Sequence, residues 1–243
     1  MNATAARARS ELYRVLAGAF DYPDAGLREA LAAHELHDAL ERLLSQVSPA
    51  LAARFDAAAL ATVPPLEELA ADYSALFDVG SSGKPPCPLY GGAYGGVERL
   101  AVMEEVVRFY DHFGLRTAEA VNEMPDALGT QLEFLHFLAG RQADVLATGG
   151  DAGPFVRAEH DFLERHPGRW VPQMRARLDA GEPSPLYREL VRVLDDSLQC
   201  MREQVTSAAS AASVAAPARV EAGRSAAARA TGRTSTAGAG DES

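Results

Sequence analysis

Apolar side chains recur every three or four positions along the first 206 residues, and this spacing constrains the fold more than any other feature. Residues 9–20 illustrate the pattern, since one helical face carries Leu12, Val15, Leu16, Ala19 and Phe20. No segment shows a convincing period of two, which is typical of a half-buried strand, and no internal repeat is evident. The sequence therefore predicts an all-α fold, a single-domain helical bundle of about nine or ten helices.

Proline, glycine and short polar segments divide this region into separate helices. The predicted helices cover residues 9–20, 24–33, 36–47, a stretch that begins after Pro65, 97–113, 126–147, 154–166, 168–180 and 185–206. In the 97–113 helix, the side chains expected to face inward are Leu100, Met103, Val107 and Tyr110. Pro125 suits the start of the next helix, and Asp126 in its first turn complements the positive end of the helix dipole.

The C-terminal residues 207–243 differ in composition from the rest of the chain. They contain no aromatic residue and no Leu, Ile or Met. A segment of this kind buries too little apolar surface to offset the entropy lost on ordering. We predict a globular domain at 1–206 and an Ala/Gly/Ser-rich disordered tail at 207–243, in which the Ala-rich positions near 207–216 can extend the preceding helix.

Charge and cysteine content argue against several classes of protein. The formal net charge is −11 with a pI near 5.0, and Lys84 is the single lysine, so nucleic-acid binding is not expected. No apolar run approaches the roughly 18 residues of a membrane span, and the N-terminal segment lacks the apolar core of a secretory signal. Cys87 and Cys200 form no C-x-x-C pair that would suggest zinc or dithiol chemistry. A cytoplasmic protein without stable membrane insertion is expected.

Motifs for catalysis are incomplete in this sequence. Glu133 and His136 form one Glu-x-x-His pair, whereas a di-iron bundle needs two such pairs. The segment around Gly83-Lys84 imitates a phosphate loop, but Asp78 replaces its first glycine and Pro85 its Ser or Thr. No catalytic residue and no metal site is therefore expected. A helical metal- or nucleotide-dependent enzyme and a generic acidic adaptor bundle stay open as alternative functions.

One loop interrupts the helical pattern and needs a separate explanation. Residues 85–96, "PPCPLYGGAYGG", hold three prolines and four glycines. Helices do not tolerate this composition, because proline lacks the amide donor and glycine loses too much backbone entropy. We call this segment the proline/glycine loop. Packing alone explains it poorly, and the same holds for "EMPDALGTQLEFLHFLA" at 123–139.

Together with "ELYRVLAGAFDYP" near the start, these two segments resemble the TorD/DmsD/NarJ-type cytoplasmic chaperones of molybdenum enzymes. In that family a run like E-x-P-D-H-L-x-x-E-L-E-F-M opens a long central helix, and the matching residues here are Glu123, Pro125, Asp126, Leu128, Leu132, Glu133 and Phe134. The likeness extends from about residue 9 to 200. "PLYGGAYGG" and "VMEEVVRFYDHFGL" point to the subgroup for enzymes of the type II dimethyl-sulfoxide-reductase group. Ala127 replaces the family's histidine and Gln131 an acidic residue, which puts in doubt any role of that imidazole.

The resemblance implies a chaperone that binds the twin-arginine signal peptide of a cofactor-free catalytic subunit and delays its export until the molybdenum cofactor is inserted. The client enzyme, and not this chain, is expected to carry bis-molybdopterin guanine dinucleotide. Such a peptide needs carboxylates beside an apolar groove with exposed backbone groups. We therefore expect Glu123 and Asp126 to bind the arginines, and an apolar wall nearby. The predicted peptide-binding residues are Tyr73, Phe77, Pro86, Leu89, Tyr90, Tyr94, Glu123, Pro125 and Asp126. The simpler interpretation is that the tyrosines pin the loop and Asp126 caps a helix.

Overall fold

The computed structural model describes residues 2–80, 83–96, 98–116 and 124–215, with side chains described as far as residue 210. Within these ranges the chain forms ten α-helices and short 3-10 and π turns, and its one β contact is an isolated bridge. The helices are α1 (Ala3–Ala19), α2 (Ala25–Ala32), α3 (Glu35–Val47), α4 (Pro49–Ala52), α5 (Leu66–Tyr73), α6 (Arg99–His112), α7 (Leu128–Ala147), α8 (Gly153–Arg165), α9 (Pro167–Asp179) and α10 (Pro185–Ala215). The prediction of an all-α bundle is confirmed. No helix in the described ranges is long and apolar enough to cross a membrane.

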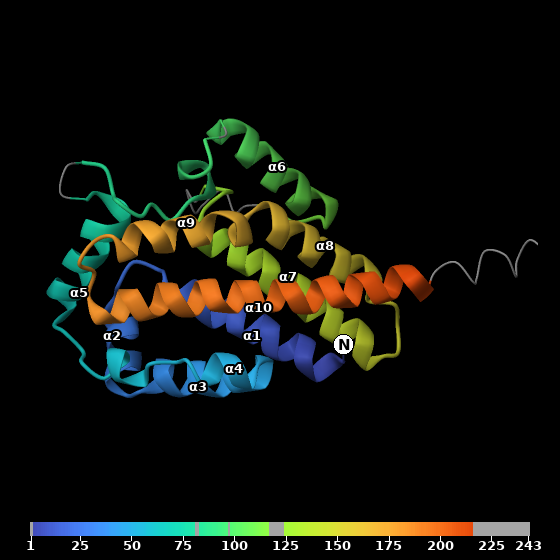
Figure 1. Ribbon diagram of the computed structural model, residues 1–243, viewed down its shortest axis with the longest axis horizontal. Helices are drawn as coiled ribbons and strands as arrows, with labels where there is room; N and C mark the ends of the chain where they lie inside the picture. Colours follow the sequence, from blue (N-terminus) through green and yellow to red (C-terminus); the bar gives the residue numbers. More distant parts are fainter. Residues whose placement is uncertain (1, 81–82, 97, 117–123, 216–243) are drawn as a thin grey trace, which may run out of the picture.

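Helices α1 and α7 pack closely at the centre of the bundle, with α10 across the front and α8 and α9 beside it (Figure 1). Small and polar residues permit this close approach. A Cβ atom on Gly140 would lie 3.3 Å from the Ser10 hydroxyl. That hydroxyl donates a hydrogen bond to the His136 carbonyl at 3.0 Å, and His136 Nδ1 lies 2.9 Å from the Ser10 carbonyl. His136, considered above as a metal ligand, therefore joins two helices.

A buried ion pair ties α1 to α7 and α8. The Arg9 guanidinium lies 3.3 Å from both carboxylate oxygens of Glu159 and donates to Gln142 Oε1 at 2.8 Å. The Tyr13 hydroxyl donates to Glu159 at 2.9 Å. Burial and the charge of Glu159 raise the pKa of Tyr13 well above its usual value. Because a buried charge is tolerated only when it is paired, this cluster fixes how the three helices pack.

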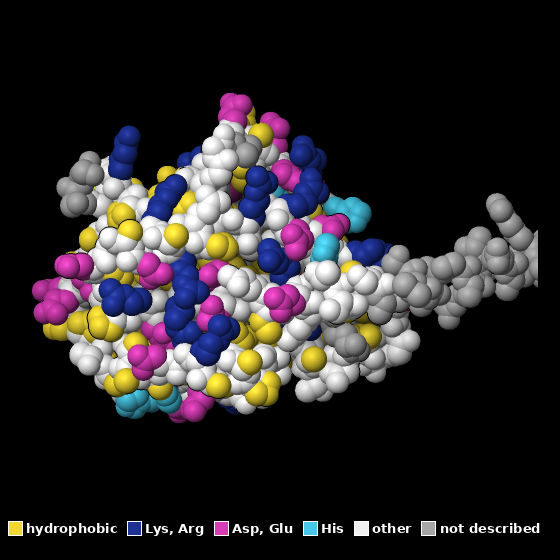
Figure 2. Space-filling view, in the orientation of Figure 1, with side chains coloured by type: hydrophobic (Ala, Val, Ile, Leu, Met, Phe, Trp, Pro, Cys, Tyr) yellow, Lys and Arg dark blue, Asp and Glu magenta, His cyan; other side chains and the backbone are white. Residues whose placement is uncertain are grey.

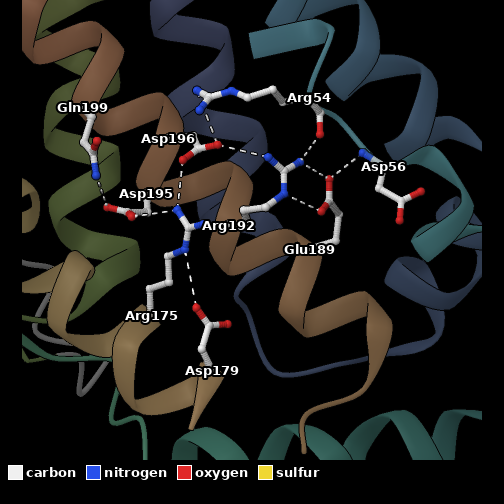
Figure 3. Close-up of polar contacts among 9 residues, drawn as sticks. All are labelled: Arg54, Asp56, Arg175, Asp179, Glu189, Arg192, Asp195, Asp196 and Gln199. Atoms are coloured by element: carbon white, nitrogen blue, oxygen red, sulfur yellow. Dashed lines mark hydrogen bonds and ion pairs between the residues drawn. The ribbon is translucent and has the colours of Figure 1, made fainter. Parts of the chain in front are cut away.

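A larger ionic network joins α9 and α10 to the segment at 54–56 (Figure 3). Arg175 on α9 donates to Asp196 on α10 at 2.9 Å. Arg192 donates to Asp196 at 3.0 Å and to Glu189, and its Nη2 also donates to the Arg54 carbonyl at 2.6 Å. Figure 2 shows this face, on which arginine side chains gather over α9 and α10 with acidic side chains between them. Much of the acidic charge on this face is therefore neutralised within the chain.

Helix α6 lies on the outside of the bundle, at the top of Figure 1. Its buried side chains are Val106 and Tyr110, whereas Leu100 is 58% exposed and Met103 and Val107 are only half-buried. The prediction that Leu100, Met103 and Val107 face inward is wrong, and only Tyr110 was placed correctly. The physical reason is that α6 packs on the bundle through the face that carries Val106 and Tyr110. The other apolar stripe, Leu100, Met103 and Val107, therefore stays at the surface.

The end of α10 lies beyond the predicted domain boundary. The helix continues to Ala215, so the boundary predicted between residues 206 and 207 falls inside it. Among the side chains described, which reach residue 210, Val205 is the last that is fully buried. Residues 216–243, which make up most of the predicted tail, lie outside the described residues, and their disorder stays a prediction.

Candidate functional site

The proline/glycine loop and the residues just before α7 lie side by side, joined by backbone hydrogen bonds. Tyr90 and Ala127 form the isolated antiparallel bridge. The Gly91 N–H donates to the Asp126 carbonyl at 2.9 Å. On the other side of the bridge, the N–H of Leu128 donates to the Leu89 carbonyl at 2.8 Å. The two segments singled out in the sequence therefore form one structural unit.

The Asp126 carboxylate points into this unit and is fully buried. Its Oδ2 accepts from the Gly92 N–H at 2.9 Å, and its Oδ1 lies 3.4 Å from Arg99 Nη2. The guanidinium carbon of Arg99 lies 4.1 Å from the centre of the Tyr90 ring. A carboxylate and an aromatic face thus flank one guanidinium group, and the Gly92 amide holds the carboxylate in place. We call Asp126, Tyr90 and Gly92 the guanidinium site, and Arg99 occupies it.

The helix start explains why Asp126 faces the loop. Helix α7 begins at Leu128 with Ala127 as N-cap, so Pro125 and Asp126 precede the helix and the prediction of a start at 126 is corrected. Asp126 therefore does not act in the first turn of α7. A turn closed by the hydrogen bond from the Ala127 N–H to the Met124 carbonyl at 2.9 Å places Asp126 directly before the bridge residue, and its carboxylate faces Gly92.

Two glycines let the loop backbone approach the site. A Cβ atom on Gly92 would lie 2.3 Å from Arg99 Cγ and 3.0 Å from Asp126 Oδ2, closer than real side chains allow. A Cβ atom on Gly91 would lie 3.2 Å from Trp170 Nε1. The glycines are therefore needed because other side chains fill the space beside the backbone.

Gln131 and Trp170 support the site from behind. Gln131 Nε2 donates to the Asp126 carbonyl at 3.0 Å, and Trp170 Nε1 donates to Gln131 Oε1 at 3.1 Å. The Tyr94 ring stacks on Trp170 with centroids 5.2 Å apart, and its hydroxyl donates to the Pro88 carbonyl at 2.9 Å. Burial raises the pKa of Tyr94. Tyr94 thus holds the loop on α9 from within the core.

Tyr73 and Phe77 lie in a separate aromatic cluster at the start of α10. Their ring centroids are 5.2 Å apart, and Phe77 lies 5.3 Å from Tyr187. The Tyr73 hydroxyl donates to the Phe20 carbonyl at 3.0 Å. Phe77 is buried, and Tyr73 is partly covered by the exposed ring of Tyr22, 5.4 Å away. The predicted apolar wall is therefore divided between two clusters.

The remaining predicted residues are placed as follows. Leu89 is half-buried against the core, and Pro86 is exposed on the loop. Pro125 is half-buried and accepts a hydrogen bond from the Tyr110 hydroxyl at 3.0 Å. Glu123 lies outside the described residues. The structure thus brings Leu89, Tyr90, Pro125 and Asp126 together, and whether they contact a peptide stays a prediction.

An apolar groove next to the guanidinium site was missed in the sequence. It has a volume of about 360 Å³ and is lined by Leu100, Met103, Glu104, Val107, Arg108 and Pro125. Leu100 directly follows Arg99 and Pro125 directly precedes Asp126, so the groove and the site are built from adjacent residues of the same two segments. The signal was present in the helical spacing of Leu100, Met103 and Val107, but that stripe was assigned to the core. We call this feature the α6 groove.

The described part of the chain offers little for catalysis. No group of three or more metal-binding side chains gathers within it. Cys87 and Cys200 are free thiols, and burial raises the pKa of Cys87 to about 11, so it is protonated at neutral pH. The guanidinium site pairs a carboxylate with the guanidinium of Arg99, and the described lining of the α6 groove contains no cysteine, serine or histidine.

Comparison with known proteins places these features in a family. Residues 23–176 match the family model described as nitrate reductase delta subunit. The chain is 35% identical to the selenate reductase assembly chaperone protein of Thauera selenatis, over 74% of this chain and 83% of that protein. It is 34% identical to the chlorate reductase assembly chaperone protein of Ideonella dechloratans, over 81% and 95%. It is 33% identical to the dimethyl sulfide dehydrogenase assembly chaperone protein of Rhodovulum sulfidophilum, over 79% and 77%.

Proposed function

The chain belongs to the nitrate reductase delta subunit family, and from this premise we propose that it is the dedicated assembly chaperone of one molybdoenzyme of the type II dimethyl-sulfoxide-reductase group. Its partner is the cofactor-free catalytic subunit of that enzyme. The chaperone binds the twin-arginine signal peptide of this subunit in the cytoplasm. Binding delays export until the client's molybdenum cofactor, bis-molybdopterin guanine dinucleotide, has been inserted.

The observation that carries this proposal is that the guanidinium site and the α6 groove are built from consecutive residues of the same two segments, Arg99-Leu100 and Pro125-Asp126. A twin-arginine signal presents an arginine pair followed by an apolar run of roughly ten residues. Asp126 and Tyr90 offer a carboxylate and an aromatic face to an arginine. Leu100 in the groove and Met124, which directly precedes Pro125, are 58% and 45% exposed and offer apolar surface to the segment that follows.

The chain is not an enzyme, in agreement with relatives that are named as assembly chaperones. A generic adaptor would also bind a partner without turnover, and it differs from a signal-peptide chaperone in what it recognises. An adaptor would treat arginine and lysine pairs alike. A site that combines a carboxylate with an aromatic face favours the planar guanidinium over the compact ammonium of lysine.

The first test measures binding of a synthetic peptide by titration calorimetry. The peptide carries an arginine pair and an apolar run, and a matched peptide carries a lysine pair. We expect the arginine peptide to bind at least about tenfold more tightly, because a charge-assisted hydrogen bond contributes roughly 1.5–3 kcal/mol. Equal affinities for the two peptides would support the adaptor.

The second test locates the apolar run with a matched pair of variants. Leu100 and Val79 are similarly exposed, at 58% and 55%, but only Leu100 lines the α6 groove. Leu100→Glu should weaken binding of the arginine peptide by about tenfold or more, because burial of one leucine contributes roughly 1.5–3 kcal/mol. Val79→Glu should leave it unchanged. The reverse result would place the apolar run near Tyr73 and Phe77 instead.

A further inference from the structure

We propose that Arg99 is an internal substitute for a client arginine, which occupies the guanidinium site in the free chain and leaves it when the client binds. This inference rests on the proposed function, because it names the competitor that a client arginine must displace. Arg99 then competes with every arginine-containing ligand for the site, and ligands that bind weakly are excluded because they cannot displace it.

Arg99 fills the site only loosely. Its Nη2 lies 3.4 Å from Asp126 Oδ1, whereas charge-assisted hydrogen bonds between a guanidinium and a carboxylate are usually about 2.7–2.9 Å long. Its Nε is buried and has no hydrogen-bond partner among the residues that the structure describes. An arginine that approaches as a fork can donate two hydrogen bonds to one carboxylate. The present occupant is therefore a weaker ligand than the site permits.

The side chain of Arg99 also marks the route by which another arginine would enter. Arg99 is 37% exposed, while the carboxylate that it contacts is completely buried. The aliphatic part of Arg99 passes over Gly92, where any added side chain would collide with it. If Arg99 swings outward, the space that its side chain occupied between the Tyr90 ring and Asp126 becomes open to another arginine.

The backbone around Arg99 is weakly held. Arg99 is the first residue of α6, and the N-cap residue Glu98 makes no side-chain capping hydrogen bond. Gly95 and Gly96 precede it with φ angles of 80° and 65°, and a Cβ atom on either would meet nothing within 4 Å. A helix start without a cap rearranges at lower cost than a capped one. Displacement of Arg99 therefore needs no change in the bundle core.

Arg177 on α9 provides a matched comparison, because its guanidinium contacts the same loop. Its guanidinium carbon lies 4.3 Å from the centre of the Tyr94 ring, close to the value for Arg99 and Tyr90. Its Nη2 lies 3.3 Å from the Ala93 carbonyl, and no ion pair to a carboxylate is found for it within the described residues. Arg177 thus shares the aromatic contact with Arg99 but lacks the buried acid, so its removal opens no arginine site.

The decisive experiment compares wild type, Arg99→Ala and Arg177→Ala in titrations with the arginine peptide and the lysine peptide. We expect Arg99→Ala to bind the arginine peptide roughly tenfold more tightly than wild type, because the competitor is gone. Arg177→Ala should match wild type, and affinity for the lysine peptide should change little. If wild type binds the peptide and Arg99→Ala binds it equally or less tightly, the inference fails and the proposed function stands. If wild type does not bind, the proposed function itself fails.

A second measurement needs no client peptide. Arg99→Ala leaves Asp126 without its cation, so its melting temperature should fall, and millimolar methylguanidinium should restore part of the loss by entering the vacated space. Arg99→Gln serves the same purpose if the alanine variant does not fold. The double variant Arg99→Ala/Asp126→Asn should show no such rescue. Equal responses of all variants to methylguanidinium would overturn the assignment of the guanidinium site.

Discussion

The imidazole of His166 is held neutral by its surroundings. It lies at the junction of α8 and α9, with its ring centroid 5.5 Å from that of Phe109 and 4.7 Å from that of Phe162. Burial lowers the pKa of His166 to about 4, and the charges of Arg165 and Arg169 act in the same direction. Its Nε2 has no hydrogen-bond partner in the described ranges. Nothing there stabilises the imidazolium form.

The depressed pKa of His166 predicts how stability depends on pH. Between pH 6.5 and 4 the unfolded chain binds a proton at this residue and the native chain does not, so stability is lost as pH falls. The loss from this residue should reach about 2 kcal/mol by pH 5. Urea unfolding at pH 7 and pH 5 should therefore show a larger decrease for wild type than for His166→Gln. The comparison isolates residue 166, because the two proteins are identical at every other position. Equal decreases would contradict this assignment.

Single residues at the candidate site were only partly predictable. The unusual composition of the proline/glycine loop and the acidic run before α7 were sufficient to predict that Asp126 lies near the loop. The partner of its carboxylate was not predictable, because Arg99 reaches Asp126 only through the three-dimensional path of the loop. Sequence spacing carries no information on which cation a buried carboxylate meets. The signal that did exist was Gly92, whose missing side chain makes room for Arg99.

At the scale of helices, α10 is held in place by ions as well as by apolar contacts. Arg192 pairs with Glu189 and Asp196, whose side chains are only 6% and 10% exposed. Asp196 also contacts Arg54 at 3.4 Å, and Glu189 accepts a hydrogen bond from the Asp56 N–H at 2.7 Å (Figure 3). The network therefore fixes α10 against the segment that links α4 to the 3-10 turn at Ala57–Leu60.

Removal of Arg192 should destabilise the fold far more than removal of an exposed arginine. Arg192→Ala leaves two nearly buried carboxylates without this cation, and we expect a loss of about 3 kcal/mol. Arg14→Ala breaks a pair with Glu11 whose side chains are 60% and 36% exposed, so its loss should stay below about 0.5 kcal/mol. Urea unfolding followed by circular dichroism measures the loss of unfolding free energy in both variants. Urea is the suitable denaturant because it is uncharged and does not screen ion pairs. Equal losses would mean that the network contributes no more than a surface pair.

Helices were more predictable than their orientation. The predicted 36–47 and 154–166 helices agree with α3 and α8 to within a residue or so at each end, because apolar spacing and breakers act locally. The inward face of α6 was assigned wrongly because this helix carries two apolar stripes, and the spacing is the same for both. Which stripe faces the core depends on where the neighbouring helices leave space. The positions of α7 and α8 decide which face of α6 is buried, and the sequence of α6 alone does not.

At the scale of the whole molecule, α10 spans the bundle and its last turns extend beyond the other helices (Figure 1). Its buried face ends with Met201 and Val205, which are completely buried. Near this end, Gln204 donates to the Val47 carbonyl at 3.0 Å and Arg202 lies 3.4 Å from Glu164. From Thr206 to Ser210 the described side chains are exposed or half-buried. Among the side chains that the structure describes, burial on α10 therefore ends at residue 205, although the helix continues.

This geometry predicts where the chain can be shortened. A chain that ends at Ser207 keeps every side chain of α10 that the structure shows to be buried, so its free energy of unfolding should equal that of the full chain within about 0.5 kcal/mol. A chain that ends at Gln199 loses Met201 and Val205, and loss of each buried apolar side chain costs roughly 2–5 kcal/mol. Urea unfolding of the three chains distinguishes these cases, and titration with the arginine peptide should give the same affinity for the first two. If the chain that ends at Ser207 were much less stable than the full chain, residues 208–243 would contribute to the fold, and the domain would not end where its apolar core ends.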